Sequence, residues 1–117
     1  MSGVLCTESM FEGNSAFDMP IGAWDMSNVT QMMFMFTMSE KFNQPIGQWN
    51  VGNVVSMYAM FKNSTKFNQP ICNWDVRNVK DMRYMFEFAA RFSQSMMKIE
   101  PDTYTHSMMN SAGYLAN

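Results

Sequence analysis

Side chains that could catalyse a reaction are few in this sequence, and none of them forms a catalytic pair. His106 is the only histidine, and it lies in the least regular stretch of the chain. Asp25 and Asp75 recur at equal distances from Asn50, which indicates a structural role. Acid–base and nucleophilic catalysis need a positioned pair or triad of groups, and no carboxylate recurs beside a nucleophile. We therefore predict that the protein is not an enzyme and has no catalytic residues.

Methionine offers the sharper chemical possibility, because soft thioether sulfur is a suitable ligand for Cu(I). The chain has 16 methionines, and several recur three residues apart, a spacing that would put their sulfurs on successive helical turns. These methionines are Met32, Met35, Met38, Met57, Met60, Met82 and Met85. They accompany Phe36, Phe61 and Phe86, so an apolar core explains them without a ligand. We predict no metal site and no cofactor, with a Met-rich Cu(I)-binding protein as a minor alternative.

An internal repeat of 25 residues must position all of these side chains. Three units align without a gap, beginning at Phe17, Phe42 and Phe67, and Phe92 is a further equivalent. Within each unit an isoleucine, a tryptophan, an Asn-Val pair and an M-x-x-M-F motif keep fixed positions. Further recurring structural positions are Trp24, Trp49 and Trp74; Met35, Met60 and Met85; and Asn28, Asn53 and Asn78.

Each unit combines two periodicities, which predict a short strand followed by a short helix. Residues 49–51 alternate apolar and polar side chains, as a strand with one buried face does. From Val54 to Phe67 the apolar residues follow helical spacing, and Asn53 just before them is a favoured helix N-cap. Such units bury their apolar faces only by stacking on one another, so the sequence predicts an α/β, right-handed solenoid of the leucine-rich-repeat type with about four strand-plus-short-helix units. The predicted strands lie near 24–26, 49–51 and 74–76.

The repeat also predicts the domain organisation, which is a single repeat domain over residues 1–117. Its parts are a partial repeat at 1–16, full repeats at 17–41, 42–66 and 67–91, and a degenerate C-terminal capping repeat at 92–117. The last segment loses the pattern, because Ser95, Ile99 and Pro101 replace the repeated Pro, Trp and Val. A disordered tail is the alternative interpretation of that segment.

The composition argues against several classes of protein. Lys and Arg number 8 and Asp and Glu 10, so the net charge of −2 argues against a nucleic-acid binder. Hydrophobic residues make up 47% of the chain, which argues against intrinsic disorder. No apolar run approaches the roughly 20 residues of a membrane span, and no signal peptide is visible. Cys6 and Cys72 occupy different positions of the repeat, so we expect neither a disulfide nor a shared metal site.

The repeated strings FNQPIGQWNVGNV and FNQPICNWDVRNV, each followed by M-x-x-M-F, resemble the BspA-like leucine-rich-repeat family. More narrowly, they are similar to its Met- and Trp-rich branch, whose unit reads FNQPIxxWDVSNVTxMxxMF. The resemblance covers residues 1–92 and implies a non-enzymatic, protein-binding or adhesion role on a bacterial cell surface. This chain departs from the family in having few units and no visible signal or lipoprotein cleavage sequence, so its localisation stays unassigned.

The variable positions beside the predicted strands are where specificity for a protein partner would lie. The candidate residues are Asp25, Ser27, Gln48, Asn50, Asn73, Asp75 and Arg77. We predict a protein-binding module whose partner is unidentified, with no nucleic-acid partner. The alternative is a structural or accessory subunit that docks on itself or on a larger assembly through its N-terminal end, where no preceding unit covers Met10, Ile21 and Trp24.

Overall fold

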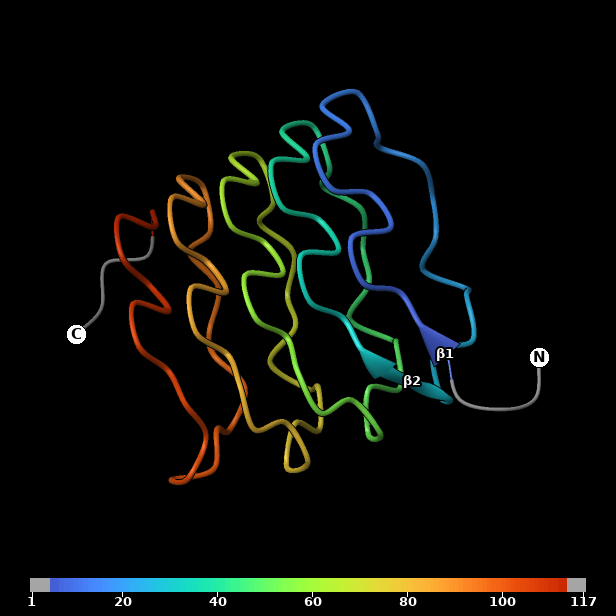
Figure 1. Ribbon diagram of the computed structural model, residues 1–117. Helices are drawn as coiled ribbons and strands as arrows, with labels where there is room; N and C mark the ends of the chain where they lie inside the picture. Colours follow the sequence, from blue (N-terminus) through green and yellow to red (C-terminus); the bar gives the residue numbers. More distant parts are fainter. Residues whose placement is uncertain (1–4, 114–117) are drawn as a thin grey trace.

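The backbone runs in 25-residue passages that lie side by side, and equivalent residues of neighbouring passages are joined by hydrogen bonds (Figure 1). We call each passage a coil. The computed structural model describes residues 5–113. Their regular secondary structure is a parallel pair of strands, β1 (Leu5–Cys6) and β2 (Val29–Gln31). Single parallel bridges then continue the pairing from Gln31 to Ser56, from Ser56 to Asp81 and from Asp81 to Tyr104.

The α/β leucine-rich-repeat-type solenoid predicted from the sequence is wrong. The described residues contain no helix, so the helices expected after Asn28, Asn53 and Asn78 do not form. The strands expected at 24–26, 49–51 and 74–76 are also absent, because the parallel pairing lies further along each coil. The chain instead forms a compact molecule, with a radius of gyration of 12.8 Å, that is built almost entirely from turns.

Three-residue turns replace the predicted helices, and neighbouring coils share their N–H groups. The N–H of Thr37 donates to the carbonyl of Phe34, three residues back in the same coil, at 3.2 Å. The N–H groups of Phe34 and Met38 donate instead to Tyr58 and Lys62 of the next coil, at 3.0 and 2.8 Å. A helix would use all these N–H groups within its own segment. The alternation between turn and neighbouring coil is therefore incompatible with a helix.

Two positions in each coil have a left-handed backbone, which makes this alternation possible. In the coil of residues 17–41 they are Phe34 and Met38, with φ of 59° and 60°. A side chain in this conformation costs about 1–2 kcal/mol, so the coil holds a strain that its hydrogen bonds and core must offset. The equivalent left-handed residues of the other coils are Ser9 and Gly13, Ala59 and Asn63, Tyr84 and Phe88, and Ser107 and Ser111.

The core consists of two stacked columns of phenylalanine rings with methionines beside them. Neighbouring rings within a column have centroids 5.5 to 6.0 Å apart, and the two columns contact each other at 3.9 to 4.1 Å. The columns are Phe11, Phe36, Phe61 and Phe86, and Phe17, Phe42, Phe67 and Phe92. Trp49 and Trp74 stack alongside, with centroids 6.4 Å apart.

Polar side chains link one coil to the next at the same positions of the unit. The side-chain oxygen of Asn43 accepts the N–H of Asn68 at 2.9 Å, and that of Asn68 accepts the N–H of Ser93 at 2.9 Å. The indole N–H of Trp49 donates to the carbonyl of Ile21 at 3.0 Å. Asn53, expected to cap a helix, donates its side-chain amide to the previous coil. Each coil therefore depends on its neighbour for side-chain as well as backbone hydrogen bonds.

Candidate functional site

The candidate partner-binding residues predicted from the sequence lie in turns and not on a strand face. All of them are exposed or half-buried, and they occupy the corners formed by residues 22–28, 47–53 and 72–78. The set is Asp25, Ser27, Gln48, Asn50, Asn73, Asp75 and Arg77. The structure thus brings them to one edge of the molecule, but the strands that were expected to present them do not form.

Several of these polar groups are already used within their own turns. The N–H and hydroxyl of Ser27 donate to the Asp25 carboxylate at 3.0 and 2.6 Å, and these bonds lower the pKa of Asp25. The Arg77 guanidinium donates to the Asp75 carboxylate at 2.7 Å and, with its own backbone N–H, lowers the pKa of Asp75. Asn50 accepts the N–H two residues ahead at 2.9 Å in the same way. These contacts explain the residue types as turn formers.

Sequence reasoning missed a row of aromatic side chains that crosses four coils. Phe34 contacts Tyr58, Tyr58 contacts Tyr84, and Tyr84 contacts His106, with ring centroids 5.4, 5.5 and 5.7 Å apart. Each contact is edge-to-face, a favourable arrangement for aromatic rings. With Arg83 and Tyr104, described next, we call this set the aromatic stripe. Its rings are half-buried or exposed, and Tyr104 is 65% exposed.

Arg83 lies between two rings of the aromatic stripe and is held there by a carboxylate. Its guanidinium carbon is 5.2 Å from the centroid of Tyr58 and 5.6 Å from that of Tyr104. Nε and Nη2 of Arg83 donate to the two oxygens of Asp81 at 3.0 and 2.8 Å. The Arg83 side chain, and its backbone N–H, hold the pKa of Asp81 below its usual range. Cation–π contacts of this kind fix both the arginine and the rings.

The comparison with protein families gives one decisive match. The family described as "Mycoplasma protein of unknown function, DUF285" matches residues 1–114. The chain belongs to this family. It is the BspA-like repeat family in general, so the coarse resemblance predicted from the sequence is confirmed. No curated protein and no solved structure matches this DUF285 chain.

One signal in the DUF285 repeat could have revealed the aromatic stripe. Two variable residues lie between the paired methionines of each unit, and one of the two is aromatic each time. These pairs are Met33-Phe34, Tyr58-Ala59 and Arg83-Tyr84. The aromatic residue changes place between units, so a column-by-column reading does not register it. The turn brings both positions of the pair to the surface, and the rings meet across that shift.

The other chemically active side chains predicted from the sequence are dispersed in this DUF285 chain. Except for Met38, which is exposed, the regularly spaced methionines are fully buried against the phenylalanine columns. Cys6 and Cys72 are free, exposed thiols, and His106 is exposed beside Tyr84. Between residues 5 and 113 no three His, Cys, Asp or Glu side chains group as metal ligands. Nor does any helix in that range have the length and hydrophobicity of a membrane span.

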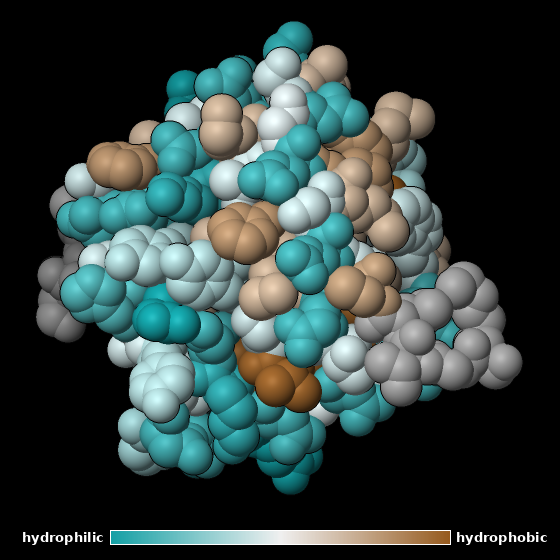
Figure 2. Space-filling model, viewed as in Figure 1, coloured by the Kyte–Doolittle hydropathy of each residue, from teal (hydrophilic) through white to brown (hydrophobic). Residues whose placement is uncertain are grey.

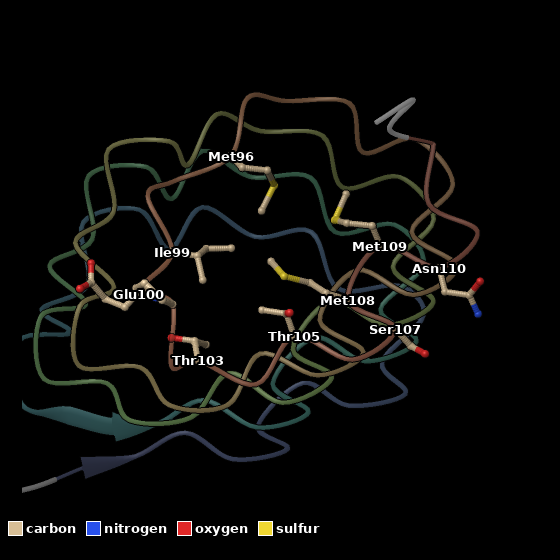
Figure 3. A pocket seen from close by; sticks show the side chains of 10 residues that line it. Met96, Ile99, Glu100, Thr103, Thr105, Ser107, Met108, Met109 and Asn110 are labelled. Atoms are coloured by element: carbon tan, nitrogen blue, oxygen red, sulfur yellow. The ribbon is translucent and has the colours of Figure 1, made fainter. Parts of the chain in front are cut away.

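The two ends of the stack of coils are hollowed and partly apolar. The C-terminal hollow has a volume of about 780 Å³, and Figure 3 shows Met96, Ile99 and Met108 pointing into it while Glu100 points away. The N-terminal hollow has a volume of about 360 Å³ and includes Trp24 in its lining. Figure 2 shows that the side of the molecule differs from these ends, since hydrophobic side chains lie there in separate patches among hydrophilic ones.

Proposed function

We propose that this chain is a non-enzymatic protein-binding module of the Met- and Trp-rich BspA-like branch, and that it contacts its partner through the aromatic stripe. The observation that supports this is the set of edge-to-face contacts from Phe34 through Tyr58 and Tyr84 to His106, with Arg83 between Tyr58 and Tyr104. Tyrosine and arginine are among the residue types that dominate binding energy in protein interfaces.

The stripe is ordered before it binds, which favours affinity. Edge-to-face contacts fix the rings, and Asp81 fixes Arg83, so little side-chain freedom is lost when a partner docks. The paired charges are also balanced on this surface. Lys62 pairs with Glu87 at 3.4 Å and lies 5.5 Å from the centroid of Tyr84. A surface with this chemistry suits an apolar or aromatic protein segment better than a highly charged one.

Backbone strain at the stripe gives independent support. Phe34 and Tyr84 hold left-handed φ angles of 59° and 61°, where glycine would carry no strain. The rings at these positions therefore act against the local backbone preference. Strained residues of this kind cluster at binding and active sites. The polar turns at Asp25 and Asp75 carry no comparable cost, because their side chains stabilise the turns they occupy.

A random peptide library selected on the immobilised 117-residue chain tests this proposal. Selected peptides are then measured by titration against the parent, against Tyr58→Ser and against Tyr84→Ser. We expect each Tyr variant to weaken binding by about tenfold or more, because an aromatic anchor in an interface is commonly worth that much. Asn73→Ser is the matched control, since Asn73 is exposed in a turn away from the stripe.

Two results would contradict the proposal. Peptides that bind the Tyr variants as tightly as the parent, but lose affinity for Asn73→Ser, would place recognition at the polar turns. A selection that yields no specific peptide in repeated rounds would count against a protein-binding function altogether. Thermal unfolding of each variant checks that a loss of binding does not come from a loss of fold.

A further inference from the structure

We propose that copies of this chain associate head to tail, with the C-terminal end of one copy docking on the N-terminal end of the next. This inference concerns a surface separate from the aromatic stripe and does not depend on the proposed function. It rests on two observations: the backbone groups at the two ends are complementary, and the apolar side chains exposed there belong to positions that are buried inside the stack.

The hydrogen bonds between coils follow one rule throughout the interior. A donor N–H bonds the carbonyl of the residue that stands just before the equivalent donor of the next coil. Ser9 donates to Met33 at 2.9 Å, and Phe34, the residue after Met33, donates to Tyr58 at 3.0 Å. The same step leads from Ala59 to Arg83 at 2.9 Å, and from Tyr84 to His106 at 3.1 Å. Four such rows run along the stack.

The last coil carries the donors for one more step. The residue after His106 is Ser107, and its φ of 54° equals that of Ala59, an interior donor. Among the described residues, no acceptor faces the N–H of Ser107 or of its companions in the other three rows. The four donors are Thr105, Ser107, Met109 and Ser111. The interior rule thus defines which groups a further coil would have to supply.

The first coil offers the matching acceptors. The carbonyl that precedes each of its donors receives no described backbone N–H, and Glu8 before Ser9 is one example. Under the interior rule, Ser107 of one copy donates to Glu8 of a second copy, and Met109 donates to Met10. Over these segments one end has only donors and the other only acceptors. Two identical ends therefore cannot pair in this way, and the association must run head to tail.

The apolar side chains lead to the same conclusion. Met10 is 49% exposed, whereas its interior equivalent Met35 is fully buried. Trp24 is 42% exposed, whereas Trp49 is 4% exposed because the preceding coil covers it and accepts its indole N–H. At the other end Met96, Ile99 and Met109 are only partly buried (Figure 3). Burying these side chains between two copies supplies the driving force that the hydrogen bonds then orient.

Head-to-tail contact is heterologous, so it produces open chains of copies. Sedimentation velocity of the full chain from low to tens of micromolar should show a weight-average mass that rises with concentration. Met10→Lys blocks the N-terminal end, and Ile99→Lys blocks the C-terminal end. Each variant alone should remain a monomer, but an equimolar mixture should form a dimer through its two intact ends and nothing larger.

Phe88→Lys is the matched control, because Phe88 is 45% exposed on the side of the stack and not at an end. This variant should associate as the parent does. The proposal is overturned if the parent stays monomeric at all concentrations, or if either blocked variant dimerises alone through its remaining end. It is also overturned if the mixture of folded, blocked variants stays monomeric while the parent associates. Circular dichroism establishes that each variant is folded.

Discussion

A single side chain in this molecule contributes according to whether a neighbouring coil covers it. Trp24 and Trp49 are 25 residues apart and hold equivalent positions of the repeat. Trp49 is 4% exposed and donates its indole N–H to Ile21 of the preceding coil at 3.0 Å, whereas Trp24 is 42% exposed. The chain therefore contains its own matched pair for measuring what coverage by another coil contributes.

Replacing Trp49 by alanine should lower the free energy of unfolding by about 3–5 kcal/mol, the usual range for a buried aromatic side chain. Trp24→Ala should cost clearly less, because that ring is only partly removed from water. Urea unfolding followed by circular dichroism measures both, at a protein concentration low enough to exclude association. Equal losses for the two variants would mean that coverage by a neighbouring coil does not decide the energy.

Asp81 links the stability of the aromatic stripe to pH. Hydrogen bonds from Arg83 lower the pKa of Asp81 in the folded state. A lowered folded-state pKa means that the stabilisation is complete above the ordinary Asp range and is lost as the pH falls through the folded-state pKa. Asp81→Asn should therefore be less stable than the parent at about pH 6, and the difference should shrink toward zero at about pH 2.

Unfolding free energies across that pH range check the Asp81 prediction. Asp102→Asn is the control, because the Asp102 carboxylate is 70% exposed and 3.5 Å from Lys80, a weak surface pair. The control should stay close to the parent at every pH. A difference between Asp81→Asn and the parent that does not change with pH would show that the carboxylate charge is unimportant.

At the scale of the elements, the turn replaces the helix because three-residue turns imitate helical spacing. Met57, Met60 and Phe61, which the sequence pattern put on one apolar face, are indeed fully buried. That pattern could not distinguish the two structures, since both direct a side chain inward about every third residue. The deciding interaction is the N–H of Ala59 donating to Arg83 of the next coil, which no local pattern can show.

The aromatic stripe was beyond sequence reasoning for a related reason. Phe34 and Tyr84 occupy one column of the repeat, whereas Tyr58 occupies the column before it. Only the left-handed turn, with φ of 59° at Phe34 and 54° at Ala59, brings the two columns to one surface. The polar turns show the opposite case. Asp25 and Asp75 were recognisable as recurring structural residues, but their role in turns became clear only with their hydrogen bonds.

The left-handed positions make a testable prediction about the turns themselves. Met38 has a φ of 60° and an exposed side chain, and the equivalent position of the first coil is Gly13. Met38→Gly should raise the free energy of unfolding by up to about 1 kcal/mol, because relief of backbone strain outweighs the extra chain entropy of glycine. Met38→Ala, which keeps the strain, should give no such gain in thermal or urea unfolding. A glycine variant less stable than the alanine variant would contradict the left-handed assignment.

For the whole molecule, the coils act as interchangeable layers because the same contacts recur between each pair. Phe36 stacks on Phe61 at 5.5 Å, and Phe61 stacks on Phe86 at 5.5 Å. The backbone bonds repeat as closely, with Phe36 donating to Met60 at 2.9 Å and Phe61 donating to Met85 at 2.8 Å. Stability in such a stack is a sum of layer and interface contributions, so the loss of one layer should be tolerated if its neighbours can meet.

Deleting residues 42–66, one complete coil of 25 residues, should therefore leave a folded protein. Lys41 is then joined to Phe67, Phe36 meets Phe86, and the donors of the first full coil find the carbonyls of the third in the same register. The denaturant m-value should fall by roughly a fifth to a quarter, in proportion to the surface that folding buries. Deleting 42–53 removes about half a coil and brings polar turns against the apolar columns, so that variant should lose cooperative unfolding. If the half-coil deletion unfolded as cooperatively as the full-coil deletion, the register between layers would not determine the fold.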